Sequence, residues 1–308
     1  MDSAFSSVSL RTKIRMAVAL MWALSGLMML QPKIHSPLFV SDILAPPAEA
    51  WQPLGIQRLL QAADTLWLKA PMIWPDVIAA LEIGGALVIA WGHNTGRTVA
   101  SFVLVIWSVI VWGVAEGFGN LFNGTGSLLT GTPGTAFLYA MATLLVIMPS
   151  AWWENHQLVY RVRQGLGWLW IMMAGLQGLP GAGFWHGPRL AEVFGLVTMD
   201  GSEPSWLQAS INDGVMLSFH HPLMTNLFLV LIMLAVGIAW LKRWRYAFGL
   251  SLVVMAIIWI VPQACGGIWT GIAPTPGMIL PLLIFIAMAR DDLMGQQPLS
   301  ERIQVKPS

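Results

Sequence analysis

The stretch Glu116-Gly-Phe-Gly-Asn-Leu-Phe-Asn-Gly-Thr-Gly126 (EGFGNLFNGTG) follows a purely apolar run and places a carboxylate among four glycines. A related stretch, QACGGIWTGIA at residues 263–273, follows another apolar run about 147 residues later, with Gln263 in the position of Glu116. Irregular backbone at membrane depth has to be buried in protein or line a wet cavity. The two stretches therefore predict a repeated architecture with a polar vestibule between the repeats.

The repeat extends beyond these two loops to the whole chain. The segment at 22–32 (WALSGLMMLQP) corresponds to the segment at 170–180 (WIMMAGLQGLP), and Thr132-Pro-Gly134 corresponds to Thr275-Pro-Gly277. Because each unit has an even number of spans, the two copies are expected to insert the same way up. The predicted organisation is a first four-helix unit at 1–150, a cytoplasmic linker at 151–163, a second unit at 164–290 and a cytoplasmic tail at 291–308.

Composition decides the class of protein. The chain is 56% hydrophobic and only 10% charged, with 17 Trp and 18 Met, so it has too little polar surface for a soluble globule of its length. It is predicted to be an integral membrane protein whose immediate partner is the lipid bilayer. A net charge of +1 without a basic run argues against nucleic-acid binding. The single cysteine, Cys265, cannot form an internal disulfide.

The spans follow from segment length, since roughly 20 mostly apolar residues cross the hydrocarbon core of a bilayer. An all-α membrane protein is predicted, with eight transmembrane helices arranged as two parallel four-helix repeats of the same orientation. The eight spans are predicted at 16–31, 73–91, 98–115, 135–152, 164–181, 222–241, 247–264 and 276–290. A cleaved signal peptide is the alternative for the first span, but Ala48-Glu-Ala50 lies far downstream for a cleavage site, which favours a retained helix.

The distribution of basic residues predicts the orientation. With cytoplasmic N- and C-termini, the inner segments carry twelve Lys and Arg residues and the outer segments four, which is a positive-inside bias. A multi-pass protein of the cell (inner) membrane is predicted, with extracytoplasmic loops at about 32–72 and 182–221. Apolar spacing within these loops predicts an amphipathic helix at 53–67 and a weaker one at 204–219, either of which could cover the vestibule or shield the bundle.

One segment resembles a known family. Leu81-Glu-Ile-Gly-Gly-Ala-Leu-Val-Ile-Ala-Trp-Gly92 is similar to the second helix of the DoxX/DoxD superfamily of four-helix membrane proteins, which carries a Glu before paired glycines. The second copy departs from this pattern, with Leu231 where Glu82 would be. The resemblance implies a tandem DoxX-like protein. Because members include a subunit of thiosulfate:quinone oxidoreductase, it also implies quinone as a cofactor and quinone-linked redox chemistry.

Two acidic residues are the candidate catalytic groups. A carboxylate deep in a bilayer costs roughly 3 kcal/mol, so it is paired, protonated or open to a wet site. Glu116 is predicted to be a proton acceptor beside a reduced quinone or a ligand for a small polar solute, with capping of loop amides as the structural alternative. Glu82 is predicted to be a proton relay, with a bond to a neighbouring helix as its alternative.

Further candidates for substrate or quinone binding are polar and aromatic residues near the two loops. Amide and hydroxyl groups can bind a headgroup, and flat indole rings suit a quinone ring. The structural alternative is that these residues bond to backbone and pack helices. The candidates are Gln263, Asn120, Asn123, Thr125, Thr270, Trp112, Trp269 and His221.

Several chemistries have no motif in this sequence. No histidine lies in the middle of a predicted span, so neither transmembrane haem nor another metal is predicted, and no phosphate-binding loop or nucleophile with an adjacent base is found. The leading prediction is a quinone-interacting subunit of an extracytoplasmic-facing oxidoreductase, working beside a redox partner subunit. The alternatives are a transporter or channel for a small polar solute through the repeat interface and a structural or assembly subunit.

Overall fold

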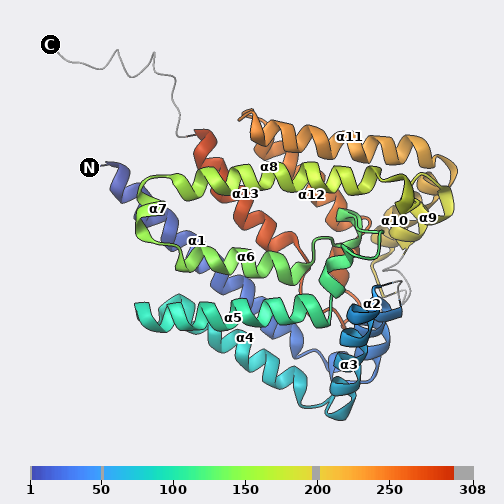
Figure 1. The fold of residues 1–308 in the computed structure, drawn as a ribbon, viewed down its shortest axis with the longest axis horizontal. Coiled ribbons are helices and arrows are strands. Elements are labelled where there is room, and N and C mark those ends of the chain that lie inside the picture. Colours follow the sequence, from blue (N-terminus) through green and yellow to red (C-terminus); the bar gives the residue numbers. More distant parts are fainter. Residues whose placement is uncertain (1, 50–51, 196–201, 295–308) are drawn as a thin grey trace.

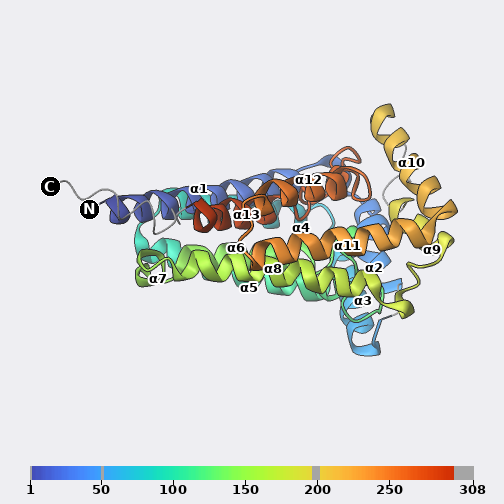
Figure 2. The same cartoon turned by 90° about the horizontal axis from the view of Figure 1, so that it is seen from above.

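The computed structural model describes residues 2–49, 52–195 and 202–294, and these residues form helices and turns without a β-strand. The predicted all-α class is therefore confirmed. Each of the eight predicted spans lies on one of the long helices, which run side by side in Figures 1 and 2. These helices are α1 (Asp2–Met29), α4 (Trp74–Trp91), α5 (Asn94–Val114), α6 (Thr135–Ile147), α8 (Gln157–Gly178), α11 (Pro222–Leu241), α12 (Ala247–Ile260) and α13 (Ile279–Met294).

Some boundaries differ from the predicted ones. The span predicted at 135–152 is interrupted, since α6 ends at Ile147 and a separate helix, α7 (Ser150–Glu154), follows Pro149. Proline disfavours helical backbone in the residue before it, which explains the break. The predicted linker at 151–163 is largely helical, because α8 already begins at Gln157. Of the predicted tail, residues 291–294 belong to α13 and residues 295–308 lie outside the described part of the chain.

The helices are compatible with an integral membrane protein. Within the described ranges, four helical segments are long and apolar enough to cross a bilayer, and α6 and α12 are shorter apolar helices. Large apolar side chains such as Leu20, Phe102, Ile106, Phe228 and Ile257 are more than half exposed. An apolar surface of this extent indicates contact with lipid rather than with water. The four segments are Leu10–Met29, Trp74–Trp91, Asn94–Val114 and Pro222–Leu241.

The two halves of the chain run in the same direction. The start of α1 and the start of α8 lie at the same end of the molecule, and α1 packs on α4 as α8 packs on α11 (Figure 1). Small residues allow these close approaches. A side chain at Gly26 would press on Ile83 of α4, and side chains at Gly167 or Gly237 would press on the facing backbone between α8 and α11.

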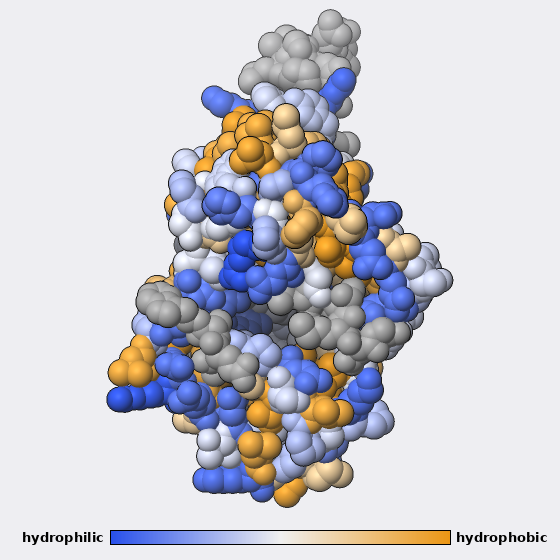
Figure 3. Space-filling model, turned by 90° about the vertical axis from the view of Figure 1, so that its right-hand side faces the viewer, coloured by the Kyte–Doolittle hydropathy of each residue, from blue (hydrophilic) through white to orange (hydrophobic). Residues whose placement is uncertain are grey.

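Shorter helices gather at the opposite end, at the right of Figure 1. Helices are confirmed in both segments where amphipathic ones are predicted, at 53–67 and 204–219, as α3 (Leu54–Lys69) and α10 (Ser205–His220), but only α3 has a clearly amphipathic pattern. In the view onto this end, hydrophilic side chains are interspersed with hydrophobic ones (Figure 3). The other short elements of these regions are η1 (Pro32–His35), η2 (Val40–Leu44), α2 (Ala45–Glu49), η5 (Pro180–Ala182) and α9 (Gly187–Gly195).

Candidate functional site

The two glycine-rich loops have nearly the same backbone. Glu116 (φ −103°, ψ 2°) precedes the short helix η3 (Gly117–Asn120), in which Phe118 and Gly119 are left-handed. Gln263 (φ −99°, ψ 4°) precedes η6 (Ala264–Gly267), in which the corresponding residues, Cys265 and Gly266, are again left-handed. The resemblance between the two sequence stretches thus extends to their local conformation.

A tryptophan near the end of the preceding helix fixes each loop. The indole Nε1 of Trp112 donates a hydrogen bond to the Pro133 carbonyl at 2.7 Å, and that of Trp259 donates to the Pro276 carbonyl at 2.9 Å. Gly119 and Gly266 pack against the same two carbonyls, which a Cβ atom at either glycine would overlap. Each loop is therefore folded back onto the turn that precedes the last long helix of its half.

Glu116 caps the helix that follows its loop. Both carboxylate oxygens accept from the backbone N–H of Ala136 at 3.1 Å, at the start of α6. A helix N-terminus favours a negative group, because unpaired N–H groups and the helix dipole both point at it. The absence of a side chain at Gly134 (φ 109°) leaves space for this cap, since a Cβ atom there would meet the Glu116 carboxylate and the Trp112 ring. Burial raises the pKa of the Glu116 carboxyl against the lowering effect of these hydrogen bonds.

Gln263 makes a different bond from the same position. Its Nε2 donates to the carbonyl of Leu128 in η4 (Leu128–Thr130) at 2.8 Å. The amide thereby joins the loop of the second half to the first half. A carboxylate could not replace it there, because two acceptors would face each other.

Each loop is held by the other half of the chain. Ser127 donates from Oγ to the side-chain oxygen of Gln177 in α8. In return, Gln31 donates from Nε2 to the carbonyl of Ala273 at 2.9 Å, and Lys33 donates from Nζ to the carbonyl of Thr270 at 2.7 Å. The exchange is reciprocal, since each loop bonds to residues at the end of the other half's first long helix.

A cavity of about 440 Å³ lies almost wholly inside the first half. Its volume falls within the range of small-molecule sites. Only Pro274 and Thr275 of the second half reach it, so the vestibule that we predicted between the repeats lies instead within one of them. Its aromatic walls are Trp22, Phe39, Trp67, Trp74, Trp107 and Tyr139, and its polar lining comes from Ser25, Glu82, Ser108, Glu116, Asn120, Thr130 and Thr135.

Three oxygens in the cavity wall lack a hydrogen-bond partner among the described residues. Glu82 accepts from Trp107 Nε1 at 3.1 Å through Oε1, which leaves its Oε2 unpaired. The hydroxyls of Ser108 and Tyr139 are also unpaired, although these side chains are only 1% and 2% exposed. A buried polar group without a partner costs about 1–3 kcal/mol. A ligand with matching polar atoms would remove that cost.

The second half has a much smaller hollow in the corresponding place. It measures about 10 Å³ and borders Leu128 and Gln263. Apart from Leu128 and Trp259, its lining residues match positions that line the large cavity. Met255 lies four residues before Trp259, as Ser108 lies four before Trp112.

Aliphatic side chains of the following helix line this second hollow. Ile279 lies three residues beyond Pro276, as Ala136 lies three beyond Pro133 in the first half. Leu282 and Tyr139 likewise lie six residues beyond these two prolines. The polar or small residue always belongs to the first half. The space that the first half leaves open is therefore packed with aliphatic side chains in the second.

The structure brings three of the predicted site residues to the cavity, namely Glu82, Glu116 and Asn120. Asn120 accepts at Oδ1 from Asn123, which in turn accepts from Thr125, so the latter two residues brace the loop. The remaining candidates, Trp112, Gln263, Thr270, Trp269 and His221, are not among the residues that line it.

Each remaining candidate has a separate environment. Trp112 and Gln263 make the backbone bonds described above. Thr270 donates from Oγ1 to the Gly267 carbonyl at 2.8 Å within its own loop. Trp269 is 44% exposed, and His221 is exposed at the junction between α10 and α11.

Sequence reasoning missed Ser25, Ser108 and Tyr139 as lining residues. Serine and tyrosine within apolar runs are common in membrane helices, so neither stands out alone. The alignment of the two halves carried the signal, because Ser108 matches Met255 and Tyr139 matches Leu282. A polar residue in only one of two copies marks a site that only that copy has.

The described ranges hold no cluster of three or more His, Cys, Asp or Glu side chains that could bind a metal ion. Comparisons with protein-family models, curated proteins and solved structures find no match for this chain. The functional argument therefore rests on the geometry of the cavity.

Proposed function

We propose that the chain is a multi-pass protein of the cell (inner) membrane, built from two parallel, DoxX/DoxD-like four-helix units that arose by duplication. The eight long helices all cross the bilayer, with cytoplasmic termini and α3 and α10 on the extracytoplasmic side. The matched loops, the matched tryptophan bonds and the common direction of the two halves support this arrangement. The helices α6 and α12 are too short to cross the bilayer alone, and the loops next to them extend through the remaining depth.

Within this arrangement, the first unit binds a quinone headgroup. The protein is then a quinone-interacting subunit of an extracytoplasmic-facing oxidoreductase, with the thiosulfate:quinone type as the leading example. The observation that carries this proposal is the aromatic cavity of about 440 Å³ with unpaired oxygens on Glu82, Ser108 and Tyr139.

The residues of the cavity fit a quinone. Indole and phenyl rings supply flat apolar surface for a planar ring, and the hydroxyls of Ser108 and Tyr139 can donate to carbonyl oxygens. When bound, a quinone supplies uptake or release of two electrons and two protons. Glu82, whose carboxyl neighbours the Ser25 hydroxyl and the Trp107 indole, can hold a proton at Oε2, whereas Glu116 is engaged with α6. Glu82 is therefore the first candidate for proton exchange, and Glu116 orients the loop.

An extracytoplasmic partner subunit would supply the electrons. The cavity reaches the elements at that end of the molecule, since Phe39, Pro47, Ala63 and Trp67 form part of its wall. A partner docked over α2 and α3 would thus stand close to the bound ring.

The test is mass analysis of lipophilic molecules extracted from the gently solubilised full-length protein. The wild type is expected to carry about one quinone per chain, and the double variant Ser108→Ala/Tyr139→Phe is expected to have lost it. Ser101→Ala is the matched control, because Ser101 is also buried with an unpaired hydroxyl on α5 but does not line the cavity. Quinone at equal levels in all three proteins, or in none, would overturn the proposal.

The same preparations address the transport hypothesis. The hollow beside Gln263 holds room for about one water molecule, so the repeat interface provides no observation in favour of a solute path. A solute flux through liposomes that contain the protein alone would favour transport over the quinone proposal.

A further inference from the structure

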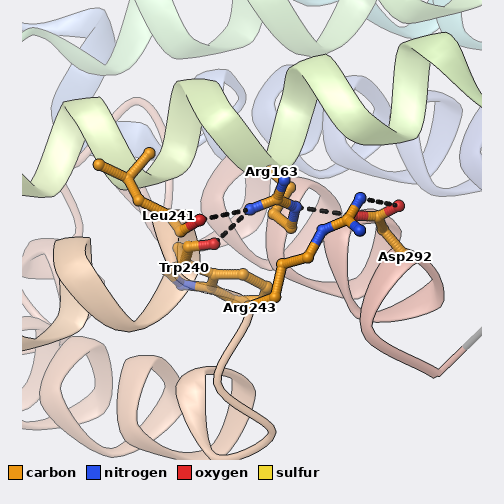
Figure 4. A network of polar contacts seen from close by, with 5 residues as sticks. All are labelled: Arg163, Trp240, Leu241, Arg243 and Asp292. Carbon is orange, nitrogen blue, oxygen red and sulfur yellow. Dashed lines mark hydrogen bonds and ion pairs between the residues drawn. The ribbon is translucent and has the colours of Figure 1, made fainter. Parts of the chain in front are cut away.

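A buried ion-pair network closes the second half at the end that carries the start of α1 and the end of α13. Arg163 of α8 is 1% exposed, and its Nε donates to Asp292 of α13 at 2.6 Å. It also donates to the carbonyls of Trp240 and Leu241 at the end of α11, and Arg243 binds the same carboxylate at 3.1 Å (Figure 4). Each charge in the network is therefore paired within the protein, as a buried charge requires.

The first half has the arginine of this network but not its carboxylate. Arg15 lies seven residues before Trp22, as Arg163 lies seven before Trp170. Asp292 lies sixteen residues beyond Pro276, and the residue sixteen beyond Pro133 is Pro149, which carries no charge. The chain turns away from the helix direction there, because α6 has already ended.

Two cations, Arg97 and Arg11, interact electrostatically with Arg15, which is also partly buried. The Nε atoms of Arg15 and Arg97 are buried and have no hydrogen-bond partner in the described part of the chain. The other contacts are to neutral groups: Arg11 donates to the Met148 carbonyl at 3.5 Å, and Arg97 donates to Asn94 at 3.3 Å. Within the described ranges, none of these three guanidinium groups forms an ion pair with an acidic side chain.

We propose that Arg15, Arg97 and Arg11 bind the phosphate group of an anionic phospholipid, which takes the place that Asp292 has in the second half. Guanidinium groups bind phosphate through charge-assisted, often paired hydrogen bonds. Arg11 and Arg15 lie on α1, and Arg97 lies in the first turn of α5, shortly after the end of α4. The apolar side chains of Trp91 and Val99 near it are 73% and 57% exposed and offer a surface for acyl chains. In the proposed orientation, the site faces the cytoplasmic leaflet, where anionic lipids attract basic residues.

The experiment measures binding of phosphatidylglycerol to the purified full-length protein by native mass spectrometry, with phosphatidylcholine as the uncharged comparison. Wild type is expected to retain phosphatidylglycerol preferentially. Arg15→Gln and Arg97→Gln are each expected to lower the affinity about fivefold, the effect of one basic residue near an anionic surface. The control is Arg245→Gln, which removes an exposed arginine at the same end of the second half. It is expected to leave binding unchanged.

A thermal-shift series separates the two sources of phosphate. Phosphatidylglycerol in mixed micelles and inorganic phosphate alone are each added to wild type and to the Arg97→Gln variant. Stabilisation by the lipid, lost in the variant and not reproduced by inorganic phosphate, supports the lipid site. The proposal is overturned if inorganic phosphate alone gives the same stabilisation. It is also overturned if the binding measurement shows equal binding of the two lipids, or an equal loss of binding in Arg97→Gln and Arg245→Gln. Arg97→Gln keeps the test valid if Arg15→Gln does not fold.

Discussion

The two halves of this molecule share a loop geometry and differ in what they enclose. Both have a left-handed turn after the third long helix, and in both a tryptophan binds the carbonyl of a proline. The first half surrounds a cavity of about 440 Å³, whereas the hollow at the matching place in the second measures about 10 Å³. A small set of side chains, not the backbone, accounts for this difference. The loop geometry that both halves share therefore serves packing in each, while the proposed ligand chemistry is confined to the first half.

The halves also differ in how their arginine charges are paired. The second half balances its buried arginine internally through Asp292, and the first half leaves Arg15 among cations. The second half thus pairs its buried arginine, although the Nε1 of Trp170, which corresponds to Trp22 of the cavity wall, has no hydrogen-bond partner among the described residues. The first half has unpaired groups at Glu82 in the cavity and at Arg15 on α1.

Removal of the Asp292 carboxylate should have the largest effect on stability. Asp292→Ala leaves Arg163 buried without its counter-charge, and breaking such a pair costs about 3–5 kcal/mol. Arg15→Gln in the first half removes a charge that no carboxylate balances, so its cost in detergent should be far smaller. Unfolding followed by intrinsic fluorescence compares the two variants. Equal destabilisation would contradict the difference that we describe in charge balance.

Exchange of cavity-lining residues between the halves should have the next largest effect. Ile279→Ala opens space in a packed wall, and a buried Ile→Ala change costs about 2–5 kcal/mol. The reverse change, Ala136→Ile, adds volume next to an existing cavity and should cost less than about 1.5 kcal/mol. It should nevertheless abolish quinone retention in the extraction assay. If Ala136→Ile retains quinone, the cavity is not the binding site.

A third comparison concerns two glycines in matching turns. A methyl group at Gly134 (φ 109°) would collide with the Glu116 carboxylate and the Trp112 ring. A methyl group at Gly277 (φ 77°) would meet its nearest atoms at 3.6 Å and 3.9 Å, which are ordinary contacts. Both alanine variants carry backbone strain, so the collision alone should make Gly134→Ala less stable than Gly277→Ala by about 2 kcal/mol. Melting temperatures of the two variants test this order, and the reverse order would refute our description of the Glu116 cap.

The smallest effect concerns the pH dependence of stability and comes from His35 in the first half. Hydrogen bonds from the His35 ring to the Gln31 carbonyl and to Asp76 raise the pKa of His35 above its ordinary value, against a lowering effect of burial. The resulting stabilisation is fully present below the unfolded-state pKa and is lost as pH rises through the higher folded-state pKa. Because Asp76 is 65% exposed, its contact with His35 should stabilise the fold by less than about 1 kcal/mol. Stability measured between pH 5 and 9 should decline in wild type more than in Asp76→Asn, and parallel curves would exclude this contact.

The sequence predicted the class, the approximate positions of the eight long helices, the two helices of the outer loops and the likeness of the two loops. These features depend on apolar length, periodicity and glycine, which are local properties. It placed a vestibule between the two repeats and did not predict a cavity within the first half. That depends on Ser108, Ala136 and Tyr139, whose roles arise only when α5 and α6 pack together.

The role of Glu116 shows the same limit of prediction from sequence. Its carboxylate was recognisable as unusual in an apolar setting, and both its capping and its chemical interpretation were open. The bond to the Ala136 amide, twenty residues further along the chain, shows that it caps α6. Sequence alone does not reveal that partner, because the turn that brings the two residues together passes through Thr132 and Pro133.

The most direct test of the central claim is photolabelling of the solubilised wild-type protein with an azido derivative of a short-chain quinone, followed by mass-spectrometric mapping of the labelled peptides. Our account predicts labelling of the first-half cavity, in the peptide that carries Trp107 to Glu116 or at Trp67, suppressed by excess unlabelled quinone and absent from Ala136→Ile. Competable labelling of the matching peptide of the second half, from Val254 to Gln263, or labelling spread evenly over both halves, would contradict it.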